Sequence, residues 1–522
     1  MFMVQKVVKI MRRNNCLKWS VVVIGILIFT GCLQVTGFSL EKVFWRGNRF
    51  YEFLAGMFPP DTKFCKTALT PLVETIRMSV AGTFAGSVAG IFSAMLCSEK
   101  LIKNKWIATV IKFVIQCIRT IPVLILALLC TYIAGIGSFA GTVSLAIYTF
   151  AVMTRIGNEL IETTSLQAFH TLFYAGAGTG RAFVRSVLVQ IMPEYCSNAL
   201  YLLETNVRHA AILGYVGAGG IGILLNEKIS WREYQKVGTI MLLLYLVVLV
   251  IESGSEFLRK YLNGSILHTR RKSWSFGIGI TLVCLYSMTA MIPPRTTQAG
   301  VKIAGAILHG LIHPDLTYLF SSAFEGVFYL LFQTVCIAFA GTIMGALAAF
   351  FLSFLNSFRL MPLAIAVPFR LMIMAIRTIP VFIYGLMFIR VTGPGSAAGV
   401  LTLGICSIGL ISKRFTTAID RMDLSAWQAY QSMGIGWLAR VKYCIMPQIM
   451  PYFLSTVLYR FDVNLRAASI LGLVGAGGIG APLITYMNNY RWDAVGSILL
   501  GLVVLILLVE AVSSYIRATL SQ

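Results

Sequence analysis

Long apolar runs alternate with short polar and basic segments along the whole chain of 522 residues. Each apolar run has about twenty residues, the length at which an α-helix spans the hydrocarbon layer of a bilayer. The runs lack the strict alternation of a membrane β-strand, so they predict helices, which satisfy every backbone hydrogen bond in lipid. The pattern predicts an all-α polytopic membrane protein with about twelve transmembrane helices.

Six spans are predicted in each half of the chain. Those of the first half lie near residues 19–38, 70–98, 107–134, 138–156, 184–206 and 236–257. Those of the second half lie near residues 274–293, 326–355, 363–390, 396–412, 443–465 and 493–516. An even number of spans gives both halves the same orientation, so parallel repeats with both termini in the cytoplasm are expected.

Two motifs recur at a spacing of 258 residues. Residues 212–222 read ILGYVGAGGIG and residues 470–480 read ILGLVGAGGIG, and IRTIPV occurs at residues 118–123 and again at 376–381. One membrane module is therefore present twice, and the chain provides both halves of an assembly that a single-copy module would form by dimerisation. The predicted division is a first repeat at 1–260, a basic cytoplasmic linker at 261–273 and a second repeat at 274–522.

Composition and charge favour the same class. Hydrophobic residues make up 57% of the chain and charged residues 12%, which is too apolar for a soluble protein of this length. The net charge of +23 could suggest nucleic-acid binding, but the basic residues cluster between apolar runs, as at 6–18, 100–105 and 259–272. This distribution is typical of cytoplasmic loops. We therefore expect a multi-pass protein of the plasma (inner) membrane, surrounded by lipid, without nucleic acid as a partner.

Cysteine and histidine spacing gives no support for a metal site. None of the eleven cysteines forms a CxxC pair, and the five histidines are scattered without an HExxH motif. The letters GAGGIG fit a dinucleotide-binding motif, but they lie between predicted membrane spans and not in a βαβ unit. The chain also lacks a GxxxxGKS or GxxxxGKT segment to bind ATP phosphates. No cofactor and no metal are predicted.

The glycines of this repeated segment allow the backbone to bend or to approach another segment closely, at the mouth of a membrane pathway. Their exposed amides could contact an anion, and a hinge or packing role is equally compatible with the sequence. The candidate glycines are Gly217, Gly219, Gly220, Gly475, Gly477 and Gly478.

Residues 424–452 lie between the fourth and fifth predicted spans of the second half and are too polar to cross the membrane. Basic residues flank them, which favours the cytoplasmic side. A short amphipathic helix, a glycine turn and a second helix entering the membrane near Pro447 would fit this pattern. The segment is either an ordinary interfacial helix or a helix that docks into a partner's groove.

The sequence Gln428-Ala429-Tyr430, followed by Gly434 and Pro447, resembles the coupling motif of ABC-importer permeases. In that family the motif is typically Glu-Ala-Ala-xxx-Gly, and its helix inserts into a cleft of the nucleotide-binding subunit. Together with the RTIP segments and the repeated NxRxAxILGxVGAGGIG pattern, it makes the chain similar to phosphonate ABC-transporter permeases of the type I fold. The similarity covers residues 70–257 and 326–516.

The resemblance implies coupling segments near 166–182 and 424–440, and neither has the family's glutamate. Gln428 replaces it in the second segment and His170 in the first, which keeps the glycine as Gly176 but lacks a proline equivalent to Pro447. We expect two coupling helices of unequal quality, the second closer to the family pattern.

The resemblance also implies partners and a function. Permeases of this family work with two cytoplasmic ATP-binding subunits and usually with an extracytoplasmic substrate-binding protein. The chain itself would not be an enzyme, and one chain would replace a permease dimer. The expected function is the membrane channel of an ATP-driven importer for phosphonate or a related phosphorus oxyanion. Open alternatives are an ABC permease for another small solute such as methionine, a twelve-helix secondary transporter, and a membrane scaffold with a closed pathway.

Charged residues within or near the predicted spans are candidate substrate-pathway residues. Arg119 and Arg377 lie in the repeated Arg-Thr-Ile-Pro segments, where the proline is expected to kink the helix. A charge at the bilayer centre costs about 2.5–3.5 kcal/mol on insertion scales, so these groups should face protein or water.

Arg208 and Arg466 lie near the ends of the fifth spans, four residues after Glu204 and Asp462 respectively. This spacing places acid and arginine on one helix face, where they can form internal salt bridges. Alternatively, the arginines form a positive lining for an anionic small-molecule substrate, because the guanidinium fork matches phosphonate oxygens. The nearby amides of Asn206 and Asn464 would add hydrogen-bonding capacity.

Overall fold

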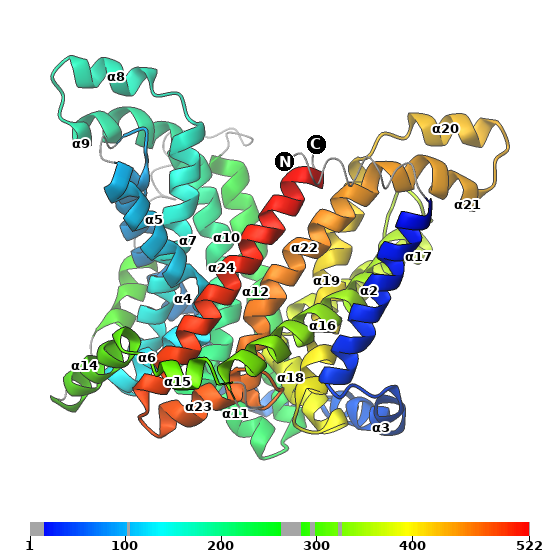
Figure 1. Ribbon diagram of the computed structural model, residues 1–522, viewed down its shortest axis with the longest axis horizontal. Helices are drawn as coiled ribbons and strands as arrows, with labels where there is room; N and C mark the ends of the chain where they lie inside the picture. The colour runs from blue at the N-terminus through cyan, green and yellow to red at the C-terminus, as the bar shows by residue number, and fades with distance from the viewer. Residues whose placement is uncertain (1–14, 102–104, 263–282, 293–297, 322–325, 521–522) are drawn as a thin grey trace. The chain divides into compact units, whose positions relative to one another are not determined.

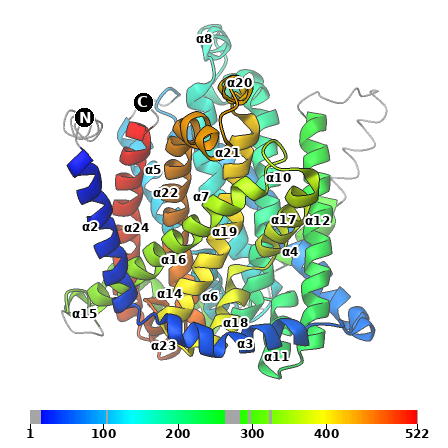
Figure 2. The ribbon, with the colours of Figure 1, turned by 90° about the vertical axis from the view of Figure 1, so that its right-hand side faces the viewer.

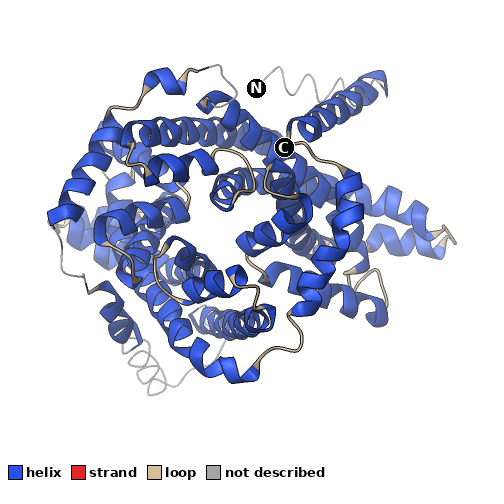
Figure 3. Cartoon of the chain, turned by 90° about the horizontal axis from the view of Figure 1, so that it is seen from below, coloured by secondary structure: helices blue, strands red, loops and turns tan. Residues whose placement is uncertain are grey.

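The protein is described here by a computed structural model that covers residues 15–101, 105–262, 283–292, 298–321 and 326–520. Every regular element in these residues is a helix, which confirms the predicted all-α class (Figure 3). Residues 263–273 of the predicted linker at 261–273, and residues 274–282 and 293 of the predicted span at 274–293, lie outside the described residues.

The helices follow the same order in both halves of the chain (Figure 1). The first half contains α2 (Asn15–Val35), α3 (Leu40–Gly56), α4 (Cys65–Cys97), α5 (Lys105–Thr120), α6 (Val123–Ala134), α7 (Ser138–Thr163), α8 (Gln167–Tyr174), α9 (Thr179–Ala182), α10 (Leu188–Leu213), α11 (Ile221–Ser230) and α12 (Tyr234–Leu262). The second contains α14 (Gln298–Ile312), α15 (Leu316–Leu319), α16 (Val327–Leu355), α17 (Leu363–Thr378), α18 (Val381–Thr392), α19 (Ser396–Arg421), α20 (Ser425–Ser432), α21 (Trp437–Arg440), α22 (Met446–Leu471), α23 (Gly480–Asn488) and α24 (Trp492–Leu520).

Among the described residues, six helices are long and apolar enough to cross a membrane. The number rises to nine if each sharply bent helix pair is counted as one span. Each predicted span within the described residues coincides with at least one helix. The chain is therefore a multi-pass membrane protein.

The repeated Arg-Thr-Ile-Pro segments break two of the predicted spans. The run predicted at 107–134 is divided into α5 and α6, and the run at 363–390 into α17 and α18, each with a bend of 90°. Pro122 and Pro380 come directly before the second helix of each pair, in extended conformation. Proline lacks an N–H donor and disfavours helix in the residue before it, so the helix stops and restarts there. The bend is sharper than the predicted kink.

Contacts divide the chain into two compact units that do not coincide with the sequence repeats. The first-repeat unit comprises residues 54–308, and the second-repeat unit comprises residues 1–53 together with 309–522. In the second-repeat unit α2 packs against α16, and α3 lies beside α18, where Phe50 stacks on Phe388 with ring centroids 5.1 Å apart (Figure 2).

The first-repeat unit contains a corresponding exchange. Residues 289–291, which end the first predicted span of the second half, pack against α4 and α7. Arg77 on α4 donates a hydrogen bond to Thr289 and lies over the ring of Tyr286 at 4.8 Å. The first span of each repeat therefore packs in the unit of the other repeat. For the second repeat this statement applies to the described part of its first span, residues 283–292.

Glycines on the second predicted span of each half let two helices approach closely. On α4, a Cβ added at Gly82 or Gly86 would come within 3.0 Å of α7. On α16, Gly341 and Gly345 are equally close to α19. Small residues at this spacing allow close helix packing in lipid, so these glycines form the packing core of each unit.

Candidate functional site

Asn206 is at the centre of the first-repeat unit. It lies on α10 and is fully buried, and its amide nitrogen donates to Thr83 Oγ1 on α4 and to Thr149 Oγ1 on α7, both at 2.8 Å. In lipid, such interhelical hydrogen bonds add to van der Waals packing. Asn206 therefore joins three helices.

Asn464 has the same place in the second-repeat unit. It lies on α22, is fully buried, and donates to Thr342 Oγ1 on α16 at 2.7 Å and to Ser407 Oγ on α19 at 2.8 Å. The side-chain oxygens of Asn206 and Asn464 are buried and have no hydrogen-bond partner among the described residues. Each amide thus positions helices and retains one free acceptor.

The predicted pair of Glu204 and Arg208 is present in the first-repeat unit. Glu204 is buried on α10, and its Oε1 lies 2.5 Å from Arg208 Nη2, one turn further along the helix. The pair neutralises both charges within the span.

The corresponding pair in the second-repeat unit is not formed. Asp462 Oδ2 instead lies 2.9 Å from Arg517 Nη1 on α24, and its Oδ1 accepts a hydrogen bond of 2.7 Å from Ser513 Oγ. Arg466 makes no hydrogen bond and no ion pair within the described part of the chain. The salt bridge between Asp462 and Arg466, one of the two alternatives from the sequence, is not formed. Arg517 on α24 binds Asp462 instead.

Arg460 is a buried charge that the sequence analysis missed. It lies on α22 one turn before Asn464, has 4% of its surface exposed, and its Nε donates to Ser407 Oγ at 3.1 Å. Its Nη2 is buried without a hydrogen-bond partner among the described residues. The position 258 residues earlier is Leu202. A mismatch of charge between aligned repeat positions is the sequence signal that could have revealed it.

Arg119 and Arg377 occupy the last turns of α5 and α17, directly before the sharp bends, and both are half-buried. Arg377 lies against Gly409 of α19, where an added Cβ would be less than 3.0 Å from the arginine side chain. The structure therefore places these arginines where the spans break, on helices other than those of Arg208 and Arg466.

The repeated glycine segments close the turns after α10 and α22. Gly217, Gly219 and Gly220 have φ of +79°, +83° and +74°, values that favour glycine. A Cβ at Gly219 would come within 3.0 Å of the Ser138 backbone at the start of α7. The following amide, of Ile221, donates to Thr75 Oγ1 on α4 at 2.8 Å.

The second glycine segment has the same geometry. Gly475, Gly477 and Gly478 have φ of +88°, +78° and +75°, and the following amide of Ile479 donates to Thr334 Oγ1 at 3.1 Å. In both copies the amide after the glycines is therefore used within the unit, and the glycines allow close backbone contact.

The two predicted coupling segments have the expected arrangement of short helix, glycine turn and second helix. α8 and α20 each span eight residues, and they are followed by Gly176 and Gly434 with φ of +90° and +73°. His170 on α8 and Gln428 and Ala429 on α20 are exposed. A π-helical turn then leads into α10 at Phe183–Val187 and into α22 at Val441–Ile445, where Pro447 starts the helix.

The short helices α8 and α20 are held in different ways. Phe169 of α8 is buried in an apolar cluster with Ala182 and Phe183. At the corresponding place in the second-repeat unit, Arg440 lies over the Trp427 ring of α20 at 4.5 Å. Asp423 precedes α20 and binds Ser425, whose backbone N–H is the main cause that lowers the pKa of the Asp423 carboxyl.

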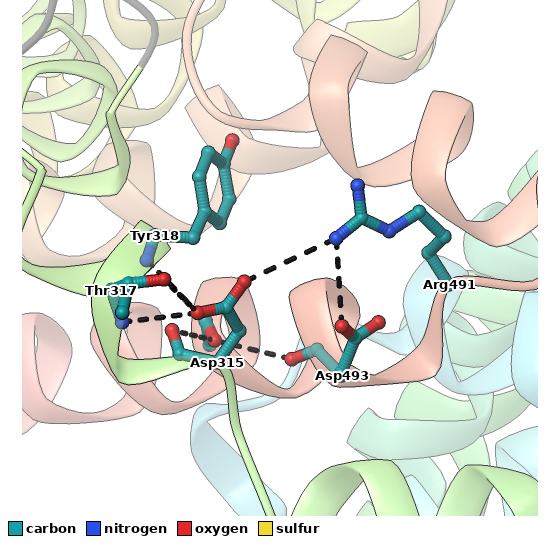
Figure 4. Close-up of polar contacts among 6 residues, drawn as sticks. Asp315, Thr317, Tyr318, Arg491 and Asp493 are labelled. Carbon is teal, nitrogen blue, oxygen red and sulfur yellow. Dashed lines mark hydrogen bonds and ion pairs between the residues drawn. The ribbon is translucent and has the colours of Figure 1, made fainter.

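A polar cluster anchors the loop before α15 to the start of α24 (Figure 4). Asp315 Oδ1 accepts hydrogen bonds from the backbone of Thr317 and Tyr318 at 3.0 and 3.1 Å, and Arg491 Nη2 lies 4.0 Å from Asp315 and 3.5 Å from Asp493. The hydrogen bond from the Thr317 hydroxyl is the main cause that lowers the pKa of the Asp315 carboxyl. The cluster is structural, because each acid has a partner within it.

The same anchor recurs in the first-repeat unit. Thr239 Oγ1 on α12 donates to the carbonyl of Asp61 at 2.9 Å, just as Ser497 Oγ on α24 donates to the carbonyl of Asp315 at 2.7 Å. Among the described residues, no group of three or more His, Cys, Asp or Glu side chains could hold a metal ion.

The two helical units share one design. Each has a broken span, a buried polar junction and a short exposed helix between its fourth and fifth spans. These features are those of a multi-pass membrane transport protein. The family described as "Binding-protein-dependent transport system inner membrane component" matches residues 86–268 and 341–522, more than half of the chain. The chain belongs to this family. Because the match occurs twice, the tandem duplication predicted from the sequence is confirmed.

Three relatives match the chain over different shares of its length. The chain is 29% identical to the phosphate-import permease protein PhnE of Mycolicibacterium smegmatis, over 86% of this chain and 85% of that protein. It is 28% identical to the phosphite transport system permease protein PtxC of Stutzerimonas stutzeri, over 46% of this chain and 86% of that protein. It is 30% identical to the putative cryptic phosphonate transport system permease protein PhnE2 of Escherichia coli, over 23% of this chain and 97% of that protein. These matches confirm the resemblance to ABC-importer permeases.

Proposed function

We propose that the chain is the membrane permease of an ATP-driven importer for phosphonate or a related phosphorus oxyanion. The observation that carries this proposal is the similarity along 86% of the chain to a permease named for phosphate import, together with similarity to permeases named for phosphite and phosphonate transport. Arg466 in the second-repeat unit, which forms no ion pair with another described residue, supplies positive charge that such a substrate requires.

The partners are two cytoplasmic ATP-binding subunits and an extracytoplasmic substrate-binding protein. The exposed helices α8 and α20 would each dock into one ATP-binding subunit, which places both termini of the chain in the cytoplasm. Since the chain has two permease modules, one copy would replace a permease dimer. The proposal is supported by the exposed positions of His170 and Gln428 on these helices.

Movement of the short helices would be transmitted directly into the membrane. α9 and α21 continue through one π-helical turn into α10 and α22, the helices that contain Arg208 and Arg466. π-Turns often mark functional sites and are less regular than α-helix. ATP binding and hydrolysis in the partner subunits would shift the population between outward-open and inward-open states.

The test is ATP hydrolysis and substrate uptake in liposomes that contain this chain, its ATP-binding subunit and its binding protein. Phosphate, phosphite, methylphosphonate and methionine are compared with no substrate, and a complex with a hydrolysis-deficient ATP-binding subunit is the control. We expect one phosphorus oxyanion to stimulate both activities. Stimulation by methionine alone would overturn the substrate class, and uptake that continues with the deficient subunit would indicate a secondary transporter.

A further inference from the structure

Four charged or polar residues near the ends of the spans occur at aligned positions in the two units. The two groups of four differ only by the one methylene group that distinguishes glutamate from aspartate. At a spacing of 258 residues, three positions are identical and the fourth exchanges glutamate for aspartate. The pairs are Glu204 and Asp462, Arg208 and Arg466, Ser255 and Ser513, and Arg259 and Arg517.

In the first-repeat unit the acid pairs with the arginine on its own helix. Glu204 Oε1 lies 2.5 Å from Arg208 Nη2. Arg259 on α12 does not pair with Glu204. Its Nε donates to the carbonyl of Ser255 on the same helix at 3.2 Å. Both charges of the Glu204–Arg208 pair are thereby compensated.

In the second-repeat unit the acid, Asp462, pairs with Arg517 on α24. Both oxygens of Asp462 are occupied, one by Arg517 at 2.9 Å and the other by Ser513 at 2.7 Å. Arg466 has no hydrogen bond or ion pair with any other described residue, and its Nε is buried. Arg466 is thus a half-buried guanidinium that has no direct partner among the described residues, although the Asp462 carboxylate lies near enough to interact with its charge.

The length of the acid explains the difference. A glutamate reaches an arginine four residues later on the same helix, and this orientation is the favourable one. The aspartate side chain is one methylene shorter, and the Ser513 hydroxyl and Arg517 bind its carboxylate from the neighbouring helix. Because three of the four positions are identical, the acid is the difference within this set that goes with the change of partner.

We propose that the two halves contribute unequally to substrate binding, with Arg466 as the residue that binds the oxyanion and Asp462–Arg517 as the pair that keeps it free. Glu204 withholds Arg208 from the same role. This inference rests on the proposed function and names the binding residue within it. The chemical class is a phosphorus oxyanion, whose oxygens accept two parallel hydrogen bonds from one guanidinium.

The test uses the reconstituted transporter and the concentration of phosphate, phosphite or methylphosphonate that gives half-maximal ATPase stimulation. Asp462→Glu keeps the charge but lets the acid reach Arg466, so this concentration should rise about tenfold, the loss expected for one charged hydrogen bond. Arg517→Gln should act in the same direction, because it frees Asp462 to pair with Arg466. Asp462→Asn combined with Arg517→Gln should restore the wild-type value, since Arg466 is free again.

Matched variants in the first-repeat unit are the controls. Glu204→Asp should lower the half-maximal concentration, because it releases Arg208. Arg466→Gln should raise it more than Glu204→Gln combined with Arg208→Gln does. Equal effects of these last two variants, or an unchanged value for Asp462→Glu in a folded transporter, would overturn the inference.

A second measurement decides the pairing without any substrate. In double-mutant cycles on thermal unfolding, Asp462 should couple more strongly to Arg517 than to Arg466, whereas Glu204 should couple more strongly to Arg208 than to Arg259. The reverse pattern would overturn the inference. If none of the three oxyanions stimulates the wild-type transporter but the cycles give the expected couplings, the proposed substrate class has failed and the unequal pairing stands.

Discussion

At the centre of each unit, one asparagine amide joins three helices. Asn206 and Asn464 donate two hydrogen bonds each to hydroxyl groups on neighbouring helices. One acceptor of Asn206 is the hydroxyl of Thr149, and the acceptor of Asn464 at the aligned position is the hydroxyl of Ser407. Serine lacks the threonine methyl group, and Arg460 approaches the hydroxyl of Ser407. The smaller side chain therefore accompanies a buried charge, Arg460, that has no charged counterpart at the aligned position Leu202.

Arg460→Leu is expected to leave thermal stability unchanged or to raise it. Leucine occupies the aligned position 202, and replacement of a buried charge by an apolar side chain is often neutral or stabilising, by about 1–4 kcal/mol. Arg460→Ala should destabilise the protein, because it leaves a cavity. Thermal unfolding in lipid nanodiscs measures both, and Leu202→Arg is the matched control, expected to be destabilising. A Leu variant as unstable as the Ala variant would show that the charge itself is needed.

The residue scale also shows the limits of prediction from sequence. Spacing alone correctly predicted that Glu204 could bind Arg208. The same spacing failed for Asp462, because its partner Arg517 lies 55 positions later and comes close only when α24 packs against α22. Hydrogen bonds between distant helices depend on packing that local periodicity does not encode.

At the element scale, apolar length and repeated motifs predicted most helices. The run from 107 to 134 is mostly apolar, yet the structure bends by 90° at Pro122. The length of an apolar run predicts that the segment lies in lipid. The direction of the helix after a proline depends on the elements against which that helix packs. The exchange of first spans was likewise beyond the sequence, since an apolar helix such as α2 has no charged residue within 19–35 to specify its neighbour.

The helices α8 and α20 should differ in their affinity for an ATP-binding subunit. His170→Gln with Thr171→Ala gives α8 the residues of α20, and about a fivefold gain in binding is expected, the effect of roughly 1 kcal/mol at an interface. The reciprocal change, Gln428→His with Ala429→Thr, should weaken binding. Titration of the ATP-binding subunit onto the chain in nanodiscs measures both. Two variants with the same sign of effect would contradict unequal coupling.

At the scale of the whole molecule, each compact unit contains residues from the first predicted span of the other repeat. Cys32 on α2 and Cys336 on α16 are both buried, and their side chains lie close enough to interact although they belong to different repeats. This contact supplies a direct test of the exchange, because neither cysteine is in a disulfide.

Oxidation, or a short crosslinker with two thiol-reactive ends, should join Cys32 to Cys336. In a chain with a protease site inserted at 261–273, the two fragments should then migrate as one band on a denaturing gel without reductant. Cys336→Ser should abolish the crosslink, whereas Cys406→Ser, also buried in the second-repeat unit, should leave it intact. Separation of the fragments in the oxidised protein would contradict the packing of α2 on α16.

The exchange has a consequence for biosynthesis. α2 emerges from the ribosome first, but α16 begins at Val327, nearly 300 residues later. At about 5–20 residues per second, α2 must wait roughly 15–60 s for its partner. A helix with all its backbone hydrogen bonds made internally and no charge between residues 19 and 35 can wait in lipid at little cost. The absence of charged residues between positions 19 and 35 of α2 is therefore a requirement of the order of synthesis as much as of the finished fold.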